Sequence, residues 1–333
     1  NQKKAVVVNS KCANVGLGEA GLEDARRMCR WTGEALGLAP ELVLPASTGV
    51  IGQPLPMERI REGTFRIRDE LGESPESIEA FARAIMTTDT RPKWRCASFG
   101  KASLLGVAKG AGMIEPDMAT MLCFVATDAA MEQDYLRSIL PDIADSTLNM
   151  LDIDGDTSTN DSLVVLANGV AGNTPLTAAS AGAGAFEDGL YEVLVQLTRQ
   201  LAQDGEGASR LIVAEVRGAR NISDARMAAK TITSSLLVKS AVYGADPNWG
   251  RLIMALGRSG AETVESKIDL YINGVCIMES GKPVPFARDA VVALMRGDEV
   301  TFGVNLNLSD GQATAWGCDL TEEYVVINSA YTT

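Results

Sequence analysis

The chain has 333 residues, a formal net charge of −13 and no histidine. A Ser-His-Asp triad, a Cys-His dyad and an H-E-x-x-H zinc site are therefore excluded within this chain, because each needs an imidazole that titrates or binds metal near neutral pH. The acidic balance, 43 Asp plus Glu against 30 Lys plus Arg, argues against nucleic acid as a partner, since nucleic-acid binding depends on clustered basic side chains.

The pattern of cysteines and apolar runs indicates in which cellular compartment the protein is expected. We find no apolar run long enough to cross a membrane and no leader segment, so we expect a cytoplasmic protein without membrane association. The abrupt start before the strand-like run at 5–8 leads us to expect that the natural chain begins earlier. Six cysteines without a C-x-x-C pair predict buried, reduced thiols rather than disulfides or a zinc site: Cys12, Cys29, Cys96, Cys123, Cys276 and Cys318.

Short apolar runs alternate with helical patterns along the first half, which is typical of an α/β protein. The second half shows a helical apolar period over 186–202 and a strong two-residue turn signal at Asn273-Gly274. We expect strands at 5–8, 42–44, from about 120 and at 163–167, helices at 22–36, 75–86, 131–140, 186–202 and 286–295, and hairpins ending near 107, over 267–278 and around 309–311.

The pattern changes to short hairpins and one helix near residue 255, which predicts a main layered domain over residues 1–254. A smaller C-terminal α+β unit is expected over 255–333, with its tail returning to the functional site.

Residues 16–21 spell G-L-G-E-A-G, and Glu41 follows about twenty residues later, as in a dinucleotide-binding fingerprint. However, about seven residues separate the predicted strand from Gly16, whereas the fingerprint needs its first glycine at the strand-to-helix turn. We interpret this segment as a loop that enters a helix.

Two other motifs fail on spacing. The alternating acids at 152–156 suggest a calcium loop, but its twelfth position is Leu163 instead of Glu, so a solvated or hydrogen-bonded turn is the better interpretation. The A-G-A-G-A run at 181–185 lacks a following Lys-Ser or Lys-Thr pair and is interpreted as a loop rather than a phosphate cradle.

An N-terminal threonine is one nucleophile that needs no histidine, because its own α-amino group, with a pKa of about 7.7–8.0, takes the hydroxyl proton. This requires a chain cut directly before the threonine. Thr120 is a plausible place, since Ala119 is small and glycines nearby relieve strain. The sequence Met-Ala-Thr-Met-Leu also fits a buried strand, and the residues alone leave both interpretations open.

Blocks of residues along the whole chain resemble the ornithine acetyltransferase family, the bifunctional glutamate N-acetyltransferases of arginine biosynthesis. They occur in the family's order. The blocks are A-S-T-G-V-I-G at 46–52, M-T-T-D-T at 86–90, K-G-A-G-M-I at 109–114, M-A-T-M-L at 118–122, D-G-D-T-S-T-N-D at 154–161, D-G-E-G-A at 204–208, D-P-N-W-G-R at 246–251 and the final stretch 324–333.

The resemblance implies an α/β/β/α layered sandwich and self-cleavage between Ala119 and Thr120. The products would be an α chain, 1–119, and a β chain, 120–333, assembled as two α and two β chains. Thr120 would then be the acyl-accepting nucleophile, and Thr48 with Gly49 would form the oxyanion hole. The matching substrate-binding positions are Thr87, Lys109, Thr120, Glu206, Asn328 and Thr333.

The implied reaction is ping-pong: Thr120 takes acetyl from N2-acetylornithine and passes it to glutamate. No metal or redox cofactor is expected, and acetyl-CoA is a possible second donor. Lys109 could bind a carboxylate or polarise the acyl group, and Glu206 could pair with an ammonium group. Which end of the substrate each residue binds does not follow from the sequence.

Some positions depart from the family's common pattern, and these bear on acyl-donor preference. The rival interpretations are a self-processing aminopeptidase or amidohydrolase that passes the acyl group to water, and a non-catalytic binding protein that stays uncut. The departures are Lys11, Cys12, Glu115, Asp117, Ala245 and a shortened segment over 94–107. The family's N-terminal segment, which would lie ahead of Asn1, is also missing from this sequence.

Overall fold

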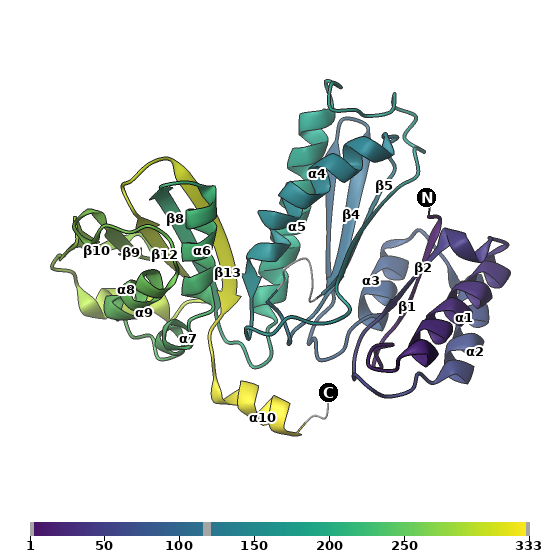
Figure 1. The fold of residues 1–333 in the computed structure, drawn as a ribbon, viewed down its shortest axis with the longest axis horizontal. Coiled ribbons are helices and arrows are strands. Elements are labelled where there is room, and N and C mark those ends of the chain that lie inside the picture. The colour runs from purple at the N-terminus through teal and green to yellow at the C-terminus, as the bar shows by residue number, and fades with distance from the viewer. Residues whose placement is uncertain (1–2, 116–120, 331–333) are drawn as a thin grey trace.

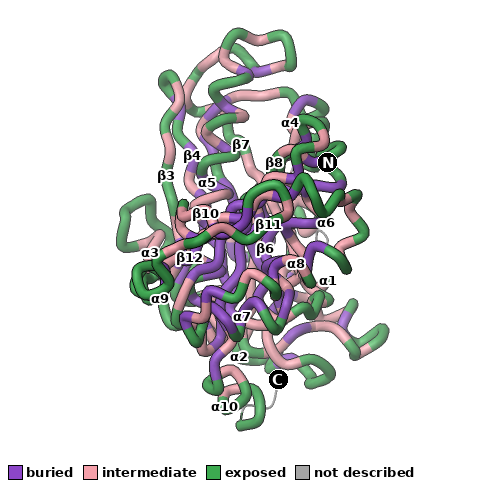
Figure 2. Tube along the Cα trace, turned by 90° about the vertical axis from the view of Figure 1, so that its left-hand side faces the viewer, coloured by how far each residue is buried: buried purple, intermediate pink, exposed green. Residues whose placement is uncertain are grey.

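The computed structural model describes residues 3–115 and 121–330, in which helices cover a two-stranded, a four-stranded and a seven-stranded sheet (Figure 1). Mixed helices and sheets in layers confirm the predicted α+β class. Buried residues gather in the strands and on the helix faces that cover them, whereas the C-terminal helix is largely exposed (Figure 2). No helix in the described residues is long and apolar enough to span a membrane.

The N-terminal part is a parallel strand pair with helices beside it. Strand β1 (Ala5–Asn9) pairs with β2 (Val43–Ser47), and helices α1 (Glu19–Leu36) and α2 (Met57–Ile67) pack against each other next to the pair. Helix α1 begins directly after Gly18, well beyond the end of β1. The glycine-rich segment is therefore a loop that enters a helix, as predicted.

A four-stranded sheet forms the centre of the molecule, with the order β3-β4-β5-β7. The predicted hairpin is confirmed as β3 (Lys93–Phe99) and β4 (Ala102–Lys109), which pair antiparallel. Strand β5 (Leu122–Thr127) is antiparallel to β4 and parallel to β7 (Ser162–Ala167). The last residue of β4 therefore lies beside the first residues of β5 and β7, at one end of the sheet.

Helices cover both faces of this sheet. On one face Val107 and Phe124 pack with Ala82 near the end of α3 (Pro75–Ala84), and with partly buried residues of β1. On the other lies α5 (Ala183–Gln203), with α4 (Gln133–Asp145) packed against it. The apolar period predicted for α5 is confirmed, because its buried face carries Phe186, Leu190, Val193, Leu194, Leu197 and Leu201.

The seven-stranded sheet has the order β11-β10-β9-β12-β8-β13-β6. The predicted hairpin at Asn273-Gly274 is confirmed by the pairing of β9 and β10. The new bounds are β6 (Leu151–Asp152), β8 (Leu211–Ala219), β9 (Asp269–Ile272), β10 (Val275–Glu279), β11 (Lys282–Pro283), β12 (Glu299–Asn305) and β13 (Gly311–Cys318).

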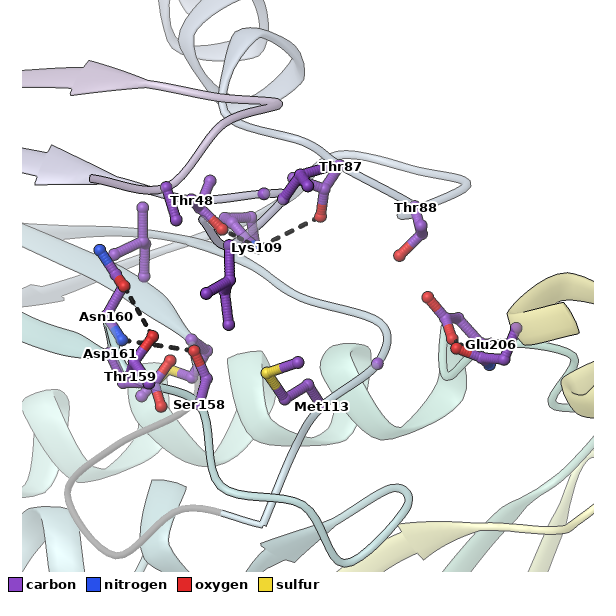
Figure 3. A pocket seen from close by; sticks show the side chains of 18 residues that line it. Thr48, Thr87, Thr88, Lys109, Met113, Ser158, Thr159, Asn160, Asp161 and Glu206 are labelled. Carbon is purple, nitrogen blue, oxygen red and sulfur yellow. Dashed lines mark hydrogen bonds between the residues drawn. The ribbon is translucent and has the colours of Figure 1, made fainter. Parts of the chain in front are cut away.

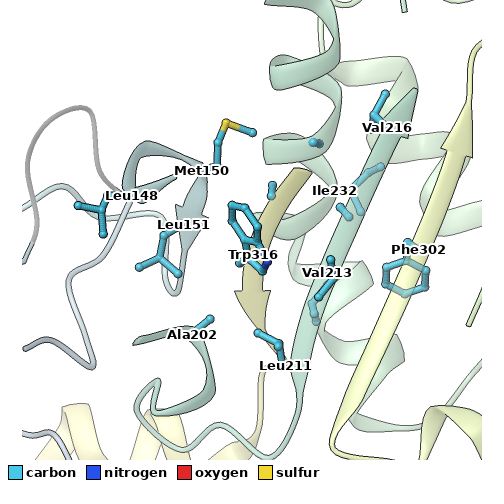
Figure 4. Packing of buried hydrophobic residues seen from close by; sticks show 14 of the residues in the cluster. Leu148, Met150, Leu151, Ala202, Leu211, Val213, Val216, Ile232, Phe302 and Trp316 are labelled. Carbon is cyan, nitrogen blue, oxygen red and sulfur yellow. The ribbon is translucent and has the colours of Figure 1, made fainter. Parts of the chain in front are cut away.

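The second predicted hairpin, around 309–311, is wrong. Strands β12 and β13 do not pair with each other, because β8 lies between them, parallel to β12 and antiparallel to β13. The turn signal shows that the chain reverses at 309–311, but it does not show which strand the chain pairs with afterwards. The apolar strand β8 pairs with both β12 and β13 and so separates them. In Figure 4, Trp316 of β13 lies between Leu151 of β6 and Ile232 of α6 (Ile222–Thr233).

The remaining helices surround this sheet or follow it. The predicted helix at 286–295 is confirmed as α9 (Arg288–Met295), and α7 (Leu236–Tyr243), α8 (Trp249–Arg258) and α10 (Glu322–Ala330) complete the set. The sheet joins strands from both sides of residue 254. The division into 1–254 and 255–333 stays a prediction.

Candidate active site

One pocket gathers the described residues that the sequence singled out (Figure 3). They reach it from the end of β2, the loop after α3, the end of β4, the turn after α5, and α10. The predicted residues that line it are Thr48, Gly49, Thr87, Lys109, Glu206 and Asn328. Met121 and Leu122 line it as well. Ala119, Thr120 and Thr333 lie outside the described residues, and their roles stay predictions.

Lys109 occupies the middle of the pocket wall. It is 7% exposed, and its Nζ donates hydrogen bonds to Thr48 Oγ1 at 2.7 Å and to Thr87 Oγ1 at 3.2 Å. Burial lowers the pKa of Lys109, while the carboxylates of Asp89 and Asp161 oppose that shift. A buried amine between two hydroxyls can stabilise an oxygen on which negative charge develops.

Gly49 needs to be glycine. Its φ of 121° lies in the region that side chains avoid, and a Cβ there would meet the carbonyl carbon of Lys11 at 2.2 Å. The Lys11 carbonyl oxygen accepts a hydrogen bond from the Val50 N–H at 3.0 Å, which fixes the Lys11 backbone beside Gly49. This contact brings the Gly49 backbone to the pocket wall next to Thr48.

Glu206 forms one end of the pocket. It is 8% exposed, and its Oε2 accepts a hydrogen bond from Asn328 Nδ2 at 2.7 Å. In Figure 3, Glu206 lies on one side of Lys109 and Asp161 on the other. A Cβ at Gly112 would meet the Glu206 carboxyl at 2.5 Å, so this glycine leaves room for the acid. A cation and an anion therefore face one cavity.

Asp161 lines the pocket but had no predicted role, although it ends the D-G-D-T-S-T-N-D block at 154–161. Its Oδ2 is enclosed and has no hydrogen-bond partner among the described residues. Burial raises the pKa of Asp161 to about 8, and the Lys109 cation opposes that shift. Burial thus favours the neutral form of this carboxyl, and the Lys109 cation favours its charged form.

The alternating acids at 152–156 form a turn rather than a calcium loop. Asp154 accepts the backbone N–H groups of Met113 at 2.6 Å and Ile114 at 2.8 Å. Its carboxylate is thus occupied in fixing the loop after β4, and the predicted hydrogen-bonded turn is confirmed. Within residues 3–115 and 121–330, no group of three or more Cys, Asp or Glu side chains is arranged to hold a metal ion.

The whole chain, residues 1–333, matches the model of the ArgJ family. The chain belongs to the ArgJ family.

Curated relatives and a solved structure agree with this assignment. The arginine biosynthesis bifunctional protein ArgJ of Symbiobacterium thermophilum is 49% identical over 334 residues, covering 99% of this chain and 83% of the relative. The protein of the same name from Thermus thermophilus is 48% identical, covering 99% and 83%. The crystal structure of the Bacillus halodurans protein has a TM-score of 0.63 and 44% identity, covering 64% of this chain and 100% of that chain.

Lys11, one of the departures identified in the sequence, contacts two residues that line the pocket. Besides packing on Gly49, Lys11 donates a hydrogen bond from Nζ to the Thr87 carbonyl at 2.9 Å. Lys11 itself has a φ of 82°. The side chain therefore links the first loop to the loop after α3. Its effect on the choice of acyl donor stays a prediction.

Replacing Asp161 by Asn should change how stability depends on pH. The folded-state pKa of about 8 lies above the ordinary aspartate pKa of 3.8, so the folded protein holds this proton where the unfolded chain has lost it. This contribution is fully present below the unfolded pKa and is lost as pH rises toward 8. Asn cannot ionise, so the Tm difference, Asp161→Asn minus wild type, should grow by a few degrees between pH 5 and 9. A constant difference in thermal scans would contradict this.

Proposed function

We propose that this ArgJ family member is a glutamate N-acetyltransferase of arginine biosynthesis, which moves acetyl from N2-acetylornithine to glutamate. The full-length similarity to arginine biosynthesis proteins supports the assignment. The observation that carries the chemistry is the pocket that Lys109 and Glu206 both line, with Lys109 near its middle and Glu206 at one end. Both substrates are small amino acids with carboxylate and amine groups, which a cation and an anion can bind together.

In the proposed mechanism the chain first cleaves itself between Ala119 and Thr120. The freed α-amino group of Thr120 takes the proton of its own hydroxyl, and Oγ bonds to the acetyl carbonyl carbon of N2-acetylornithine. The C–N bond breaks, and ornithine leaves with the proton on its amine. Glutamate then attacks the ester through its α-amine, the C–O bond breaks, and the Thr120 hydroxyl is restored.

The pocket residues have complementary roles in this proposal. The Gly49 amide and the Thr48 hydroxyl, which also accepts a hydrogen bond from Lys109, would stabilise the oxyanion of each tetrahedral intermediate. Thr87, Glu206, Asn328 and Thr333 would bind the substrates. We further propose acetyl-CoA as an alternative donor to the same threonine, a cytoplasmic location, an α2β2 assembly, and a reaction without metal or redox cofactor.

The test is an assay of acetyl transfer with the purified protein and N2-acetylornithine. With glutamate present, ornithine and N-acetylglutamate should form in equal amounts; without it, ornithine release should stop after one equivalent of enzyme is acylated. Steady release of ornithine and acetate at the same rate without glutamate would overturn the proposal and favour a hydrolase.

A further inference from the structure

A buried lysine that does not line the pocket joins the loop after α3 to the turn after α5. Lys93 is 1% exposed, and its Nζ donates hydrogen bonds to Asp89 Oδ1 at 2.6 Å and to Asp204 Oδ2. The Asp89 and Asp204 side chains are 0% and 3% exposed. Lys93 therefore pairs with two buried carboxylates from distant parts of the chain, and the half-exposed Arg91 adds a longer ion pair to Asp204, from Nε to Oδ1 at 3.9 Å.

Asp89 uses its remaining contacts to fix the cationic side of the pocket. Its Oδ2 accepts the Thr87 N–H at 3.0 Å, and its Oδ1 accepts the Gly110 N–H at 2.6 Å. These amides belong to Thr87 itself and to the residue after Lys109. Burial opposes ionisation, but Lys93 and Lys109 hold the pKa of Asp89 below its ordinary value. The carboxylate thus stays charged and keeps both segments in place.

Asp204 fixes the acidic side. It follows the last residue of α5 and stands two positions before Glu206. Its Oδ2 accepts the Thr90 N–H at 3.1 Å, and its Oδ1 accepts the Thr90 hydroxyl. The loop after α3, which carries Thr87, is thereby joined to the turn that carries Glu206. Lys93 is the group shared by both halves of this network.

We propose that Lys93 is a positioning residue that sets the distance between the cationic and acidic sides of the pocket, and with it the length of the amino-acid substrate accepted. The inference rests on the proposed function, since it concerns the same pocket. Without the Lys93 cation, two buried carboxylates would repel each other, and the segments that carry Thr87 and Glu206 would move apart. Substrate binding would weaken, and discrimination between side chains that differ by one methylene would be lost.

The experiment compares Lys93→Met, which keeps the length but loses the charge, with wild type. Two acyl donors, N2-acetylornithine and N2-acetyllysine, differ by one methylene. We expect KM for N2-acetylornithine and glutamate to rise about tenfold, with a smaller change in kcat, and the ratio of kcat/KM for the shorter over the longer donor to fall about tenfold. Unchanged KM values and an unchanged ratio would overturn the inference.

A matched control separates positioning from loss of folding. Lys239 is also 1% exposed and pairs with a buried acid, Asp152, at 2.9 Å, but it does not line the pocket. Lys239→Met should lower thermal stability without changing the donor ratio; an equal change of the ratio in this variant would show that Lys93 has no specific role. If Lys93→Met does not fold, Lys93→Arg, which keeps the charge with a different reach, should still shift the ratio, and a wild-type ratio would refute the idea.

Failure of the proposed function would look different, because wild type would then show no glutamate-dependent transfer. In that case calorimetry with N2-acetylornithine and N2-acetyllysine tests the pocket without turnover. Lys93→Met should bind the shorter ligand about tenfold more weakly and lose the wild-type preference between the two. Equal affinities in the variant and wild type would overturn the inference on Lys93.

Discussion

Thr120→Ala should remain a single uncut chain and should lose glutamate-dependent acetyl transfer by about 10⁴-fold or more. Alanine removes the hydroxyl that would attack the Ala119 carbonyl, so neither the cleavage nor the acyl-threonine can form. The two effects share one cause, because the same side chain serves first in processing and then in catalysis. A denaturing gel and the transfer assay measure them side by side.

Thr120→Ser is the matched variant. Serine keeps a hydroxyl and, after cleavage, an α-amino group, so this variant should be cut and should retain part of the activity. A Thr120→Ala variant that is cut, or one that transfers acetyl at the wild-type rate, would remove Thr120 from both steps.

Gly49→Ala should destabilise the protein by about 3 kcal/mol and lower kcat/KM by about 10²–10³-fold. The φ of 121° is strained for alanine, and the new Cβ would lie 2.2 Å from the backbone carbonyl carbon of Lys11. Because this neighbour is backbone, it cannot rotate away, so the Gly49 amide must move from the proposed oxyanion hole. Urea denaturation and steady-state kinetics measure the two losses.

Gly63→Ala is the control for this substitution. Gly63 lies inside α2, its φ is not in the positive range, and a Cβ there would meet nothing within 4 Å. Alanine should therefore leave activity unchanged and stabilise the fold by about 0.5–1 kcal/mol. Similar stability and activity in the two variants would mean that the Gly49 backbone is not strained by a side chain.

Helices and turns that are determined by a short stretch of sequence were predicted correctly. The apolar period of α5 and the Asn273-Gly274 turn each lie within one stretch of chain, and both are confirmed. The error around 309–311 is of another kind. A turn signal shows where the chain reverses but not which strand it reaches, and β8 enters the sheet from far along the chain.

The candidate site shows the same division. Resemblance to the family named Thr48, Lys109 and Glu206, and the structure brings these three to one pocket. Lys93 carries no such signal, because its sequence context is that of an ordinary strand residue. Its importance depends on Asp204, a partner 111 positions away. Ion pairs of this kind are set by tertiary packing, which no short motif records.

The most direct test of the account is the intact mass of the purified protein before and after incubation with N2-acetylornithine alone. We predict two fragments separated between Ala119 and Thr120, and, after incubation, one added acetyl group on the fragment 120–333, located on Thr120 and removed by glutamate. An uncut chain of 333 residues that still transfers acetyl to glutamate, without any acetyl on Thr120, would contradict the account.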